Sequence, residues 1–176
     1  MVCFIYDTII DMKLIILRGL PGCGKSVIAE KLGEKLDNPV IYGDFFKREY
    51  MKDNPEFVNK DVYQYSYDKI FEKIKDLFES GEETVIVEEL FNDVDLLGKI
   101  ENFCRENIIE IKAFFIQRDL EKLLELEETR GRKVKNTKED FGKLEKEIRD
   151  NEIEGEIIMD NNKTLEGSVE FVLKNI

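Results

Sequence analysis

The residues best suited to chemistry in this chain form the run Gly-Leu-Pro-Gly-Cys-Gly-Lys-Ser at positions 19–26. The run matches the pattern G-x-x-x-x-G-K-[ST], in which glycines let successive backbone N–H groups converge on a phosphate. The lysine of this pattern reaches the β and γ phosphates of a nucleotide, and the hydroxyl residue binds Mg²⁺. We therefore expect a site for Mg-ATP here. Its expected ligand-binding residues are Gly19, Gly22, Cys23, Gly24, Lys25 and Ser26.

The segments on either side of this run are those that the chemistry requires. Residues 13–18 form an apolar run that predicts a buried strand, and residues 25–36 have the apolar spacing of a helix. A helix that begins at Lys25 directs its positive N-terminal dipole at a bound phosphate. The same dipole stabilises a thiolate, so we expect Cys23 to react readily with alkylating reagents and to be protected by ATP.

Apolar runs alternate with amphipathic stretches along the rest of the chain, as in a parallel sheet that helices cover on both faces. Strands are expected at 13–18, 39–42, 84–88, 108–116 and 156–159. Helices are expected at 25–36, 70–78, 95–107, 120–129, 138–151 and 165–176. Segments 45–60 and 130–137 show no clean period and are expected to be loops or short helices. The pattern predicts one α/β layer sandwich with five strands.

No linker or repeat divides the chain, and its length of 176 residues fits a single domain. We expect that domain to span residues 13–176. Residues 1–12 precede the first strand, and they are either an N-terminal extension or an extra edge element of the sheet.

The composition excludes several classes of protein. With 27 Lys and Arg against 39 Asp and Glu, the net charge is −12, which disfavours the coating of nucleic acid. The chain has no histidine and only three widely spaced cysteines, which excludes the usual zinc sites and Ser-His-Asp triads. Its apolar runs are far shorter than the roughly 20 residues of a membrane span. No signal-peptide pattern precedes the first strand, so we expect a cytoplasmic protein.

Residues 18–26 resemble the phosphate loop of P-loop NTPases, and residues 13–176 resemble one branch of them, the small kinases of metabolites, nucleosides and polynucleotide ends. GTPases are less similar, since the chain has no Asn-Lys-x-Asp segment, and AAA-type ATPases are expected to be too long. The resemblance implies a three-layer α/β sandwich with five parallel strands in the order 2-3-1-4-5. It also implies that the protein transfers the γ-phosphoryl group of Mg-ATP to a hydroxyl of a small acceptor.

In many of these kinases an aspartate after the second strand accepts the proton of the substrate hydroxyl, and Asp44 holds that place here. The resemblance implies that this carboxylate faces the γ-phosphate; the alternative is a turn residue or a helix cap. The aromatic pair at 45–46 is a candidate wall for an acceptor pocket within the substrate-binding segment 45–60. Lys47 and Arg48 either hold an anionic substrate or are solvated.

The third expected strand ends in acids where the family places the carboxylate that organises Mg²⁺, normally an aspartate. Here the residue is Glu88, and Glu89 follows it. Because Mg²⁺ keeps several waters and needs only one or two carboxylates, Glu88 and Ser26 are the expected metal site. The choice between Glu88 and Glu89 stays open, because Glu89 and Asn92 could instead line the acceptor site.

The family carries a lid after the fourth strand and the helix that follows it, here at residues 130–137. The resemblance implies that Arg130 and Arg132 close over the transferring phosphoryl group, although basic residues also occur at helix ends for dipole reasons alone. Arg118, just past the fourth strand, is a further candidate to face the phosphates. The run 157–161 resembles the family's adenine-side loop, which implies that Asn161 contacts the nucleotide.

Two alternatives to a small-molecule kinase stay open. An RNA or DNA end kinase uses the same chemistry and is disfavoured by the acidic charge. A regulatory module that binds ATP and hydrolyses it slowly or not at all is favoured only by the glutamate at position 88. ATP consumption that depends on an added acceptor distinguishes a kinase from such a module. No pattern in the chain identifies the acceptor or the oligomeric state.

Overall fold

A five-stranded parallel sheet in the order β2-β3-β1-β4-β5 forms the centre of the described chain. The computed structural model describes residues 11–53, 60–131 and 135–176. The strands are β1 (Lys13–Arg18), β2 (Val40–Tyr42), β3 (Thr84–Glu88), β4 (Glu110–Gln117) and β5 (Ile157–Asp160). The helices are α1 (Lys25–Leu36), α2 (Gly43–Asp53), α3 (Lys60–Glu79), α4 (Val94–Glu106), α5 (Leu120–Thr129), α6 (Lys138–Asp150) and α7 (Leu165–Leu173). The predicted strand order is confirmed.

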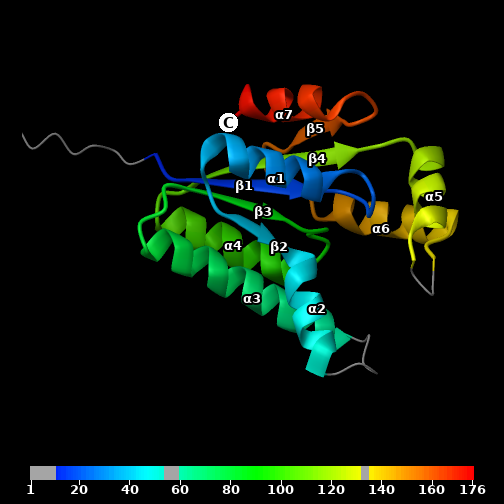
Figure 1. The fold of residues 1–176 in the computed structure, drawn as a ribbon. Coiled ribbons are helices and arrows are strands. Elements are labelled where there is room, and N and C mark those ends of the chain that lie inside the picture. Colours follow the sequence, from blue (N-terminus) through cyan, green and yellow to red (C-terminus); the bar gives the residue numbers. More distant parts are fainter. Residues whose placement is uncertain (1–10, 54–59, 132–134) are drawn as a thin grey trace, which may run out of the picture.

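Helices cover both faces of this sheet, so the predicted three-layer sandwich is also confirmed. Helices α1 and α7 lie on one face and α3 and α4 on the other, while α5 and α6 lie toward the carboxyl ends of the strands (Figure 1). The side chains of β1 alternate between the two faces: Leu14 and Ile16 belong to the apolar cluster under α3 and α4, and Ile15 and Leu17 to the cluster under α1 and α7. Each such buried side chain contributes about 1.5–3 kcal/mol to folding.

Arg18, the last residue of β1, is fully buried and ties this strand to the end of α6. Its Nη1 donates to the carbonyl O of Asn151 at 2.6 Å, its Nη2 donates to the carbonyl O of Ile148, and its Nε lies 3.3 Å from Oε1 of Glu156. The last carbonyl groups of a helix carry partial negative charge, which stabilises the buried guanidinium. The strand that leads into residues 19–26 is therefore fixed to α6.

Several bounds differ from the sequence-based expectation, most of all that of α3, which starts at Lys60 although the helix was expected at 70–78. Helix α2 starts directly after β2, in a segment expected to be a loop or a short helix, and it packs against α3 rather than on the sheet. It carries few aliphatic residues, and its partly buried side chains include Phe46, Tyr50 and Met51. Strand β4 starts at Glu110, because Ile108 has a positive φ of 57° and is 84% exposed in the turn after α4.

Some predictions concern residues outside the described part of the chain. These residues include 1–10, 54–59 of the expected substrate-binding segment, and Arg132 of the expected lid. The predictions for these residues stay predictions. Within 11–53, 60–131 and 135–176, no helix combines the length and the apolar character that a membrane crossing requires.

Candidate active site

The phosphate loop joins β1 to α1 and bends at Gly19, Gly22 and Gly24, whose φ angles are 142°, 90° and 105°. A side chain at Gly19 would collide with the carbonyl O of Ile116, so the loop runs directly against β4. The Nζ atom of Lys25 donates to the carbonyl O of Gly19 at 2.8 Å and of Leu20 at 3.1 Å. The ammonium group is thus held within the curve of the loop, where a phosphate would present its oxygens.

Asn161 holds the phosphate loop from the side of β5. Its Nδ2 donates to the carbonyl O of Cys23 at 2.6 Å, and its Oδ1 accepts from Oγ of Ser168 at 2.6 Å. A side chain at Gly24 would collide with this amide. The geometry makes Asn161 a positioning residue of the loop, and its predicted contact with the nucleotide stays a prediction.

The Cys23 side chain points into the protein core rather than toward solvent. It is fully buried in the apolar cluster that also contains Ile28 and Leu123. A reagent cannot reach a thiol in this position, so the expectation that Cys23 alkylates readily is wrong for this conformation. The backbone of Cys23 remains part of the loop, and its N–H donates to the carbonyl O of Leu20 at 3.2 Å.

Glu88, the predicted metal-binding carboxylate, ends β3 beside the phosphate loop and is 5% exposed. Burial raises the pKa of its carboxyl to about 7; Lys25 lowers this pKa, Glu89 and Asp44 raise it further, and Ser26 lowers it. Glu88 therefore lies close enough to Lys25, Ser26, Asp44 and Glu89 to interact electrostatically with each of them. The Ser26 side chain is exposed and lies within hydrogen-bonding reach of the Glu88 carboxylate, so this donor set fits Mg²⁺ with several retained waters.

The raised pKa of Glu88 makes stability depend on pH. Between its ordinary value of 4.5 and about 7, the folded chain binds a proton that the unfolded chain has released, so stability falls as pH rises through this range. At pH 8 the ionised carboxylate destabilises the fold by about 3 kcal/mol. Glu88→Gln is therefore expected to raise the melting temperature at pH 8 and to change it little at pH 4.5. Calorimetry at both pH values tests this; an equal shift at both would contradict the raised pKa.

Lys47 and Glu89 form a buried ion pair between α2 and β3. The Nζ atom of Lys47 lies 2.6 Å from Oε1 of Glu89 and 3.4 Å from Oδ1 of Asp44. The Oε1 atom of Glu89 also accepts from the N–H of Leu90 at 2.8 Å. Arg48 is exposed, and its Nε donates to the carbonyl O of Asp44 at 3.3 Å. Glu89 is thus engaged as the partner of Lys47, whereas the side chain of Asp44, in the first turn of α2, is open to solvent.

Arg130, the first of the two predicted lid arginines, lies against the phosphate loop. Its Nη2 is 3.4 Å from the position that a Cβ atom on Gly22 would take. Its Nη1 donates to Oε2 of Glu127 at 3.2 Å, and Oε1 of Glu127 accepts from both the N–H and Nδ2 of Asn136 at 3.2 Å. Glu127 is only 2% exposed. Sequence reasoning missed this residue, because in a helix rich in glutamate only its spacing from Arg130 sets it apart.

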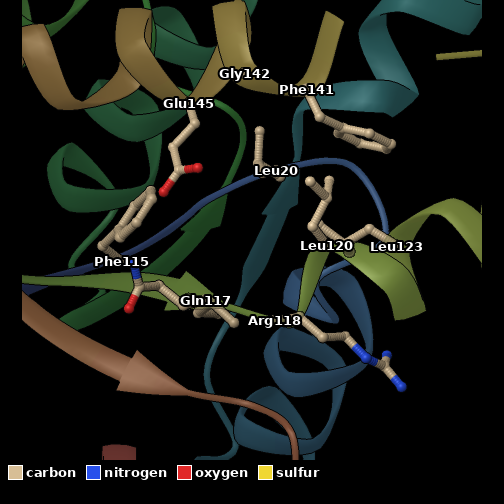
Figure 2. A pocket seen from close by; sticks show the side chains of 10 residues that line it. Leu20, Phe115, Gln117, Arg118, Leu120, Leu123, Phe141, Gly142 and Glu145 are labelled. Carbon is tan, nitrogen blue, oxygen red and sulfur yellow. The ribbon is translucent and has the colours of Figure 1, made fainter. Parts of the chain in front are cut away.

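A small pocket of about 160 Å³ lies beside the phosphate loop, between β4, α5 and α6. Figure 2 shows Leu20 of the loop pointing toward Phe141 of α6, with Leu123 of α5 nearby, while the guanidinium of Arg118 points away from them. The Nε atom of Arg118 is buried and makes no hydrogen bond to the described residues. Apolar contacts thus join the loop to both helices that flank the predicted lid. The predicted place of Arg118 at the phosphates stays a prediction.

A larger pocket of about 490 Å³ lies between α3, the loop after β3, and α6. On its lining, Oη of Tyr67 donates to Oδ1 of Asn92 at 3.1 Å, and Nδ2 of Asn92 donates to Oε2 of Glu147 at 2.9 Å. Leu90 also lines it and stands two residues after Glu88. The larger pocket therefore adjoins the end of β3 that carries the candidate metal site.

Comparison with known proteins gives the family. A family model described as an AAA domain matches residues 14–147, from β1 through most of α6. The chain belongs to this AAA domain family. The expectation that AAA-type proteins are too long for this chain is wrong for this family, whose domain fits within it. A search of curated proteins finds no match.

Solved structures with the fold of this AAA domain protein include several kinases. A candidate kinase from Chloroflexus aurantiacus has 19% identity and a TM-score of 0.74, covering 94% of this chain and 98% of that one. A gluconokinase from Sinorhizobium meliloti has 17% identity and a TM-score of 0.67, covering 93% of this chain and 90% of that one. A shikimate kinase from Aquifex aeolicus has 22% identity and a TM-score of 0.59, covering 92% of this chain and 94% of that one. These likenesses show the P-loop kinase-like fold that the sequence resemblance implied.

Proposed function

We propose that this protein is an ATP-dependent phosphotransferase that moves the γ-phosphoryl group of Mg-ATP to a hydroxyl of a small-molecule acceptor. The observation that carries this proposal is the convergence of Lys25, Ser26 and Glu88 at the carboxyl ends of β1 and β3. The open carboxylate of Asp44, directly after β2, and the larger pocket, beside the loop after β3, both lie at the carboxyl edge of these parallel strands. The fold shared with structures named as kinases supports the same function.

Each part of the phosphate site has a role in this proposal. The loop backbone and Lys25 would hold the ATP phosphates, and Ser26 and Glu88 would hold Mg²⁺ through its waters. When bound, the metal ion neutralises charge on the β and γ oxygens. Lys25 would exchange its bonds to loop carbonyl groups for bonds to phosphate oxygens.

Asp44 is the best placed general base among the predicted carboxylates. Its side chain is exposed and contributes to the electrostatic environment of Glu88. Glu89 already accepts hydrogen bonds from Nζ of Lys47 and from the N–H of Leu90 at its Oε1 atom, so this oxygen is occupied. We therefore assign to Asp44 the removal of the proton from the acceptor hydroxyl as the phosphoryl group is transferred.

Arg130 is proposed to act on the transferring phosphoryl group, held in place by Glu127. Because an arginine fork can bind two phosphate oxygens, Arg130→Ala is expected to lower kcat and kcat/KM together, by about 10- to 100-fold. Glu127→Gln, which keeps the shape of the side chain but weakens the ion pair, should have a smaller effect in the same direction. Steady-state kinetics tests this, with Arg105→Ala, at an exposed position of α4, as the control. An effect of Arg130→Ala on KM alone would assign Arg130 to simple binding.

The function itself is tested by ATP consumption in the presence of Mg²⁺ and a panel of hydroxyl compounds. A kinase releases ADP at a rate that depends strongly on one added acceptor. Tight ATP binding with a low rate that no acceptor changes would instead indicate a regulatory nucleotide-binding module. RNA and DNA ends belong in the panel, since they would identify the end-kinase alternative directly.

A further inference from the structure

The larger pocket, defined above by α3, the loop after β3, and α6, has two carboxylates on its lining, those of Asp93 and Glu147. The hydroxyl of Tyr67 donates to Oδ1 of Asn92, and Nδ2 of Asn92 donates to Oε2 of Glu147. The Nε2 atom of Gln64, also on the lining, donates to Oδ1 of Asp68 at 3.1 Å. This chain of bonds ends at a carboxylate, which keeps lone pairs for a ligand that donates hydrogen bonds.

The charge on the same surface is negative. Asp93 and Glu147 line the pocket, and their charges, together with that of the nearby Glu89, act on the Tyr67 hydroxyl: after burial, these carboxylates are causes of its raised pKa. Lys47, whose Nζ lies 5.3 Å from the centre of the Tyr63 ring, is already paired with Glu89. Among the described lining residues, Lys60 is the one cation, and it is exposed at the start of α3.

We propose that the acceptor is a polyhydroxylated molecule that brings no acidic group into the larger pocket: an amino sugar or its neutral parent sugar, rather than a sugar acid or a phosphate ester. This inference rests on the proposed kinase function. An anion entering here would lose water beside Asp93 and Glu147 without gaining a buried cationic partner. Hydroxyl and ammonium groups instead donate to those carboxylates, and the exposed Tyr63 side chain adds an aromatic surface beside them.

The test uses sets of compounds that share a carbon skeleton and differ in charge, such as glucosamine, glucose and gluconate, with pentose and cyclitol sets beside them. Binding to the wild-type protein is followed by ligand-observed NMR without ATP, and turnover by ADP release with Mg-ATP. We expect the amine to exceed the acid by roughly tenfold or more, with the neutral compound between them. Preferred binding or turnover of the acids would overturn the proposal, and so would the absence of binding by every amine and neutral compound.

The two readouts separate this proposal from the proposed function. Turnover of acids would leave a kinase whose acceptor class is assigned wrongly. The expected binding order without any acceptor-stimulated ADP release would support the pocket assignment and contradict the kinase.

The Glu147 carboxylate is the residue whose change tests the assignment most sharply. Glu147→Gln is expected to reduce the ratio of amine to acid binding by roughly tenfold, because it removes the charge but keeps an acceptor oxygen. Glu139→Gln, on the same helix and ion-paired with exposed Lys143, is the matched control and should leave the ratio unchanged. An unchanged ratio in Glu147→Gln, with an unchanged melting temperature, would overturn the role of this carboxylate in acceptor choice.

Discussion

Replacing Asp44 with asparagine is expected to lower acceptor phosphorylation by about 10²- to 10⁴-fold while leaving the affinity for Mg-ATP nearly unchanged. Asparagine keeps the shape of the side chain and removes its basicity. The carboxylate of Asp44 lies at the start of α2, where its negative charge helps to raise the pKa of Glu88 at the end of β3. The measurements are kcat/KM for the acceptor and the Kd for Mg-ATP by calorimetry.

Glu49→Gln is the matched control for this change, because Glu49 lies on the same helix and accepts from the hydroxyl of Tyr65 at 3.2 Å. It should phosphorylate the acceptor at the wild-type rate. If Asp44→Asn also did so, Asp44 would be a cap or turn residue. Glu89 would then be the next candidate for the base, and it would have to leave Lys47 to act.

Lys25→Ala is expected to weaken the binding of Mg-ATP and to reduce any turnover by about 10²- to 10³-fold. The change removes the charge that we assign to the phosphate oxygens, and it also removes two hydrogen bonds inside the phosphate loop. A thermal melt of the variant shows whether the fold is retained. Lys35→Ala, in the exposed last turn of α1, is the control. Intact ATP affinity and turnover in Lys25→Ala would show that the phosphate-loop assignment is wrong.

Local patterns in the sequence were sufficient to predict most of the fold. The bounds of β1, α1, β3 and α5 agree with the expected ranges, because continuous apolar runs and the glycine-rich motif mark their ends. The strand order followed from the resemblance to small P-loop kinases, which is a property of the whole pattern rather than of any one segment. Segment 45–60 was expected to be a loop or a short helix, and neither the 11-residue length of α2 nor the start of α3 at Lys60 was predicted, because α2 packs against α3 and carries few apolar residues.

The contacts that shape the candidate site were harder to predict, since they join residues far apart in the sequence. The bond from Asn161 to Cys23 spans 138 positions and that from Arg18 to Asn151 spans 133, and no local periodicity encodes either of them. The motif identified Cys23 correctly as a loop residue but not the direction of its thiol, which depends on the packing of Ile28 and Leu123. Residue types thus indicated the chemistry, whereas tertiary packing decides which side chains are free to perform it.

The proposed phosphotransfer is tested most directly by following the terminal phosphate of ATP itself. ATP labelled in its γ-phosphoryl group is incubated with the protein, Mg²⁺ and the acceptor that gives the greatest ADP release, and the products are separated by mass. We expect the label on a hydroxyl of the acceptor, in an amount equal to the ADP formed, and at least 100-fold less of it with Asp44→Asn. Label found only in free inorganic phosphate, at a rate that the acceptor does not change, would contradict a kinase.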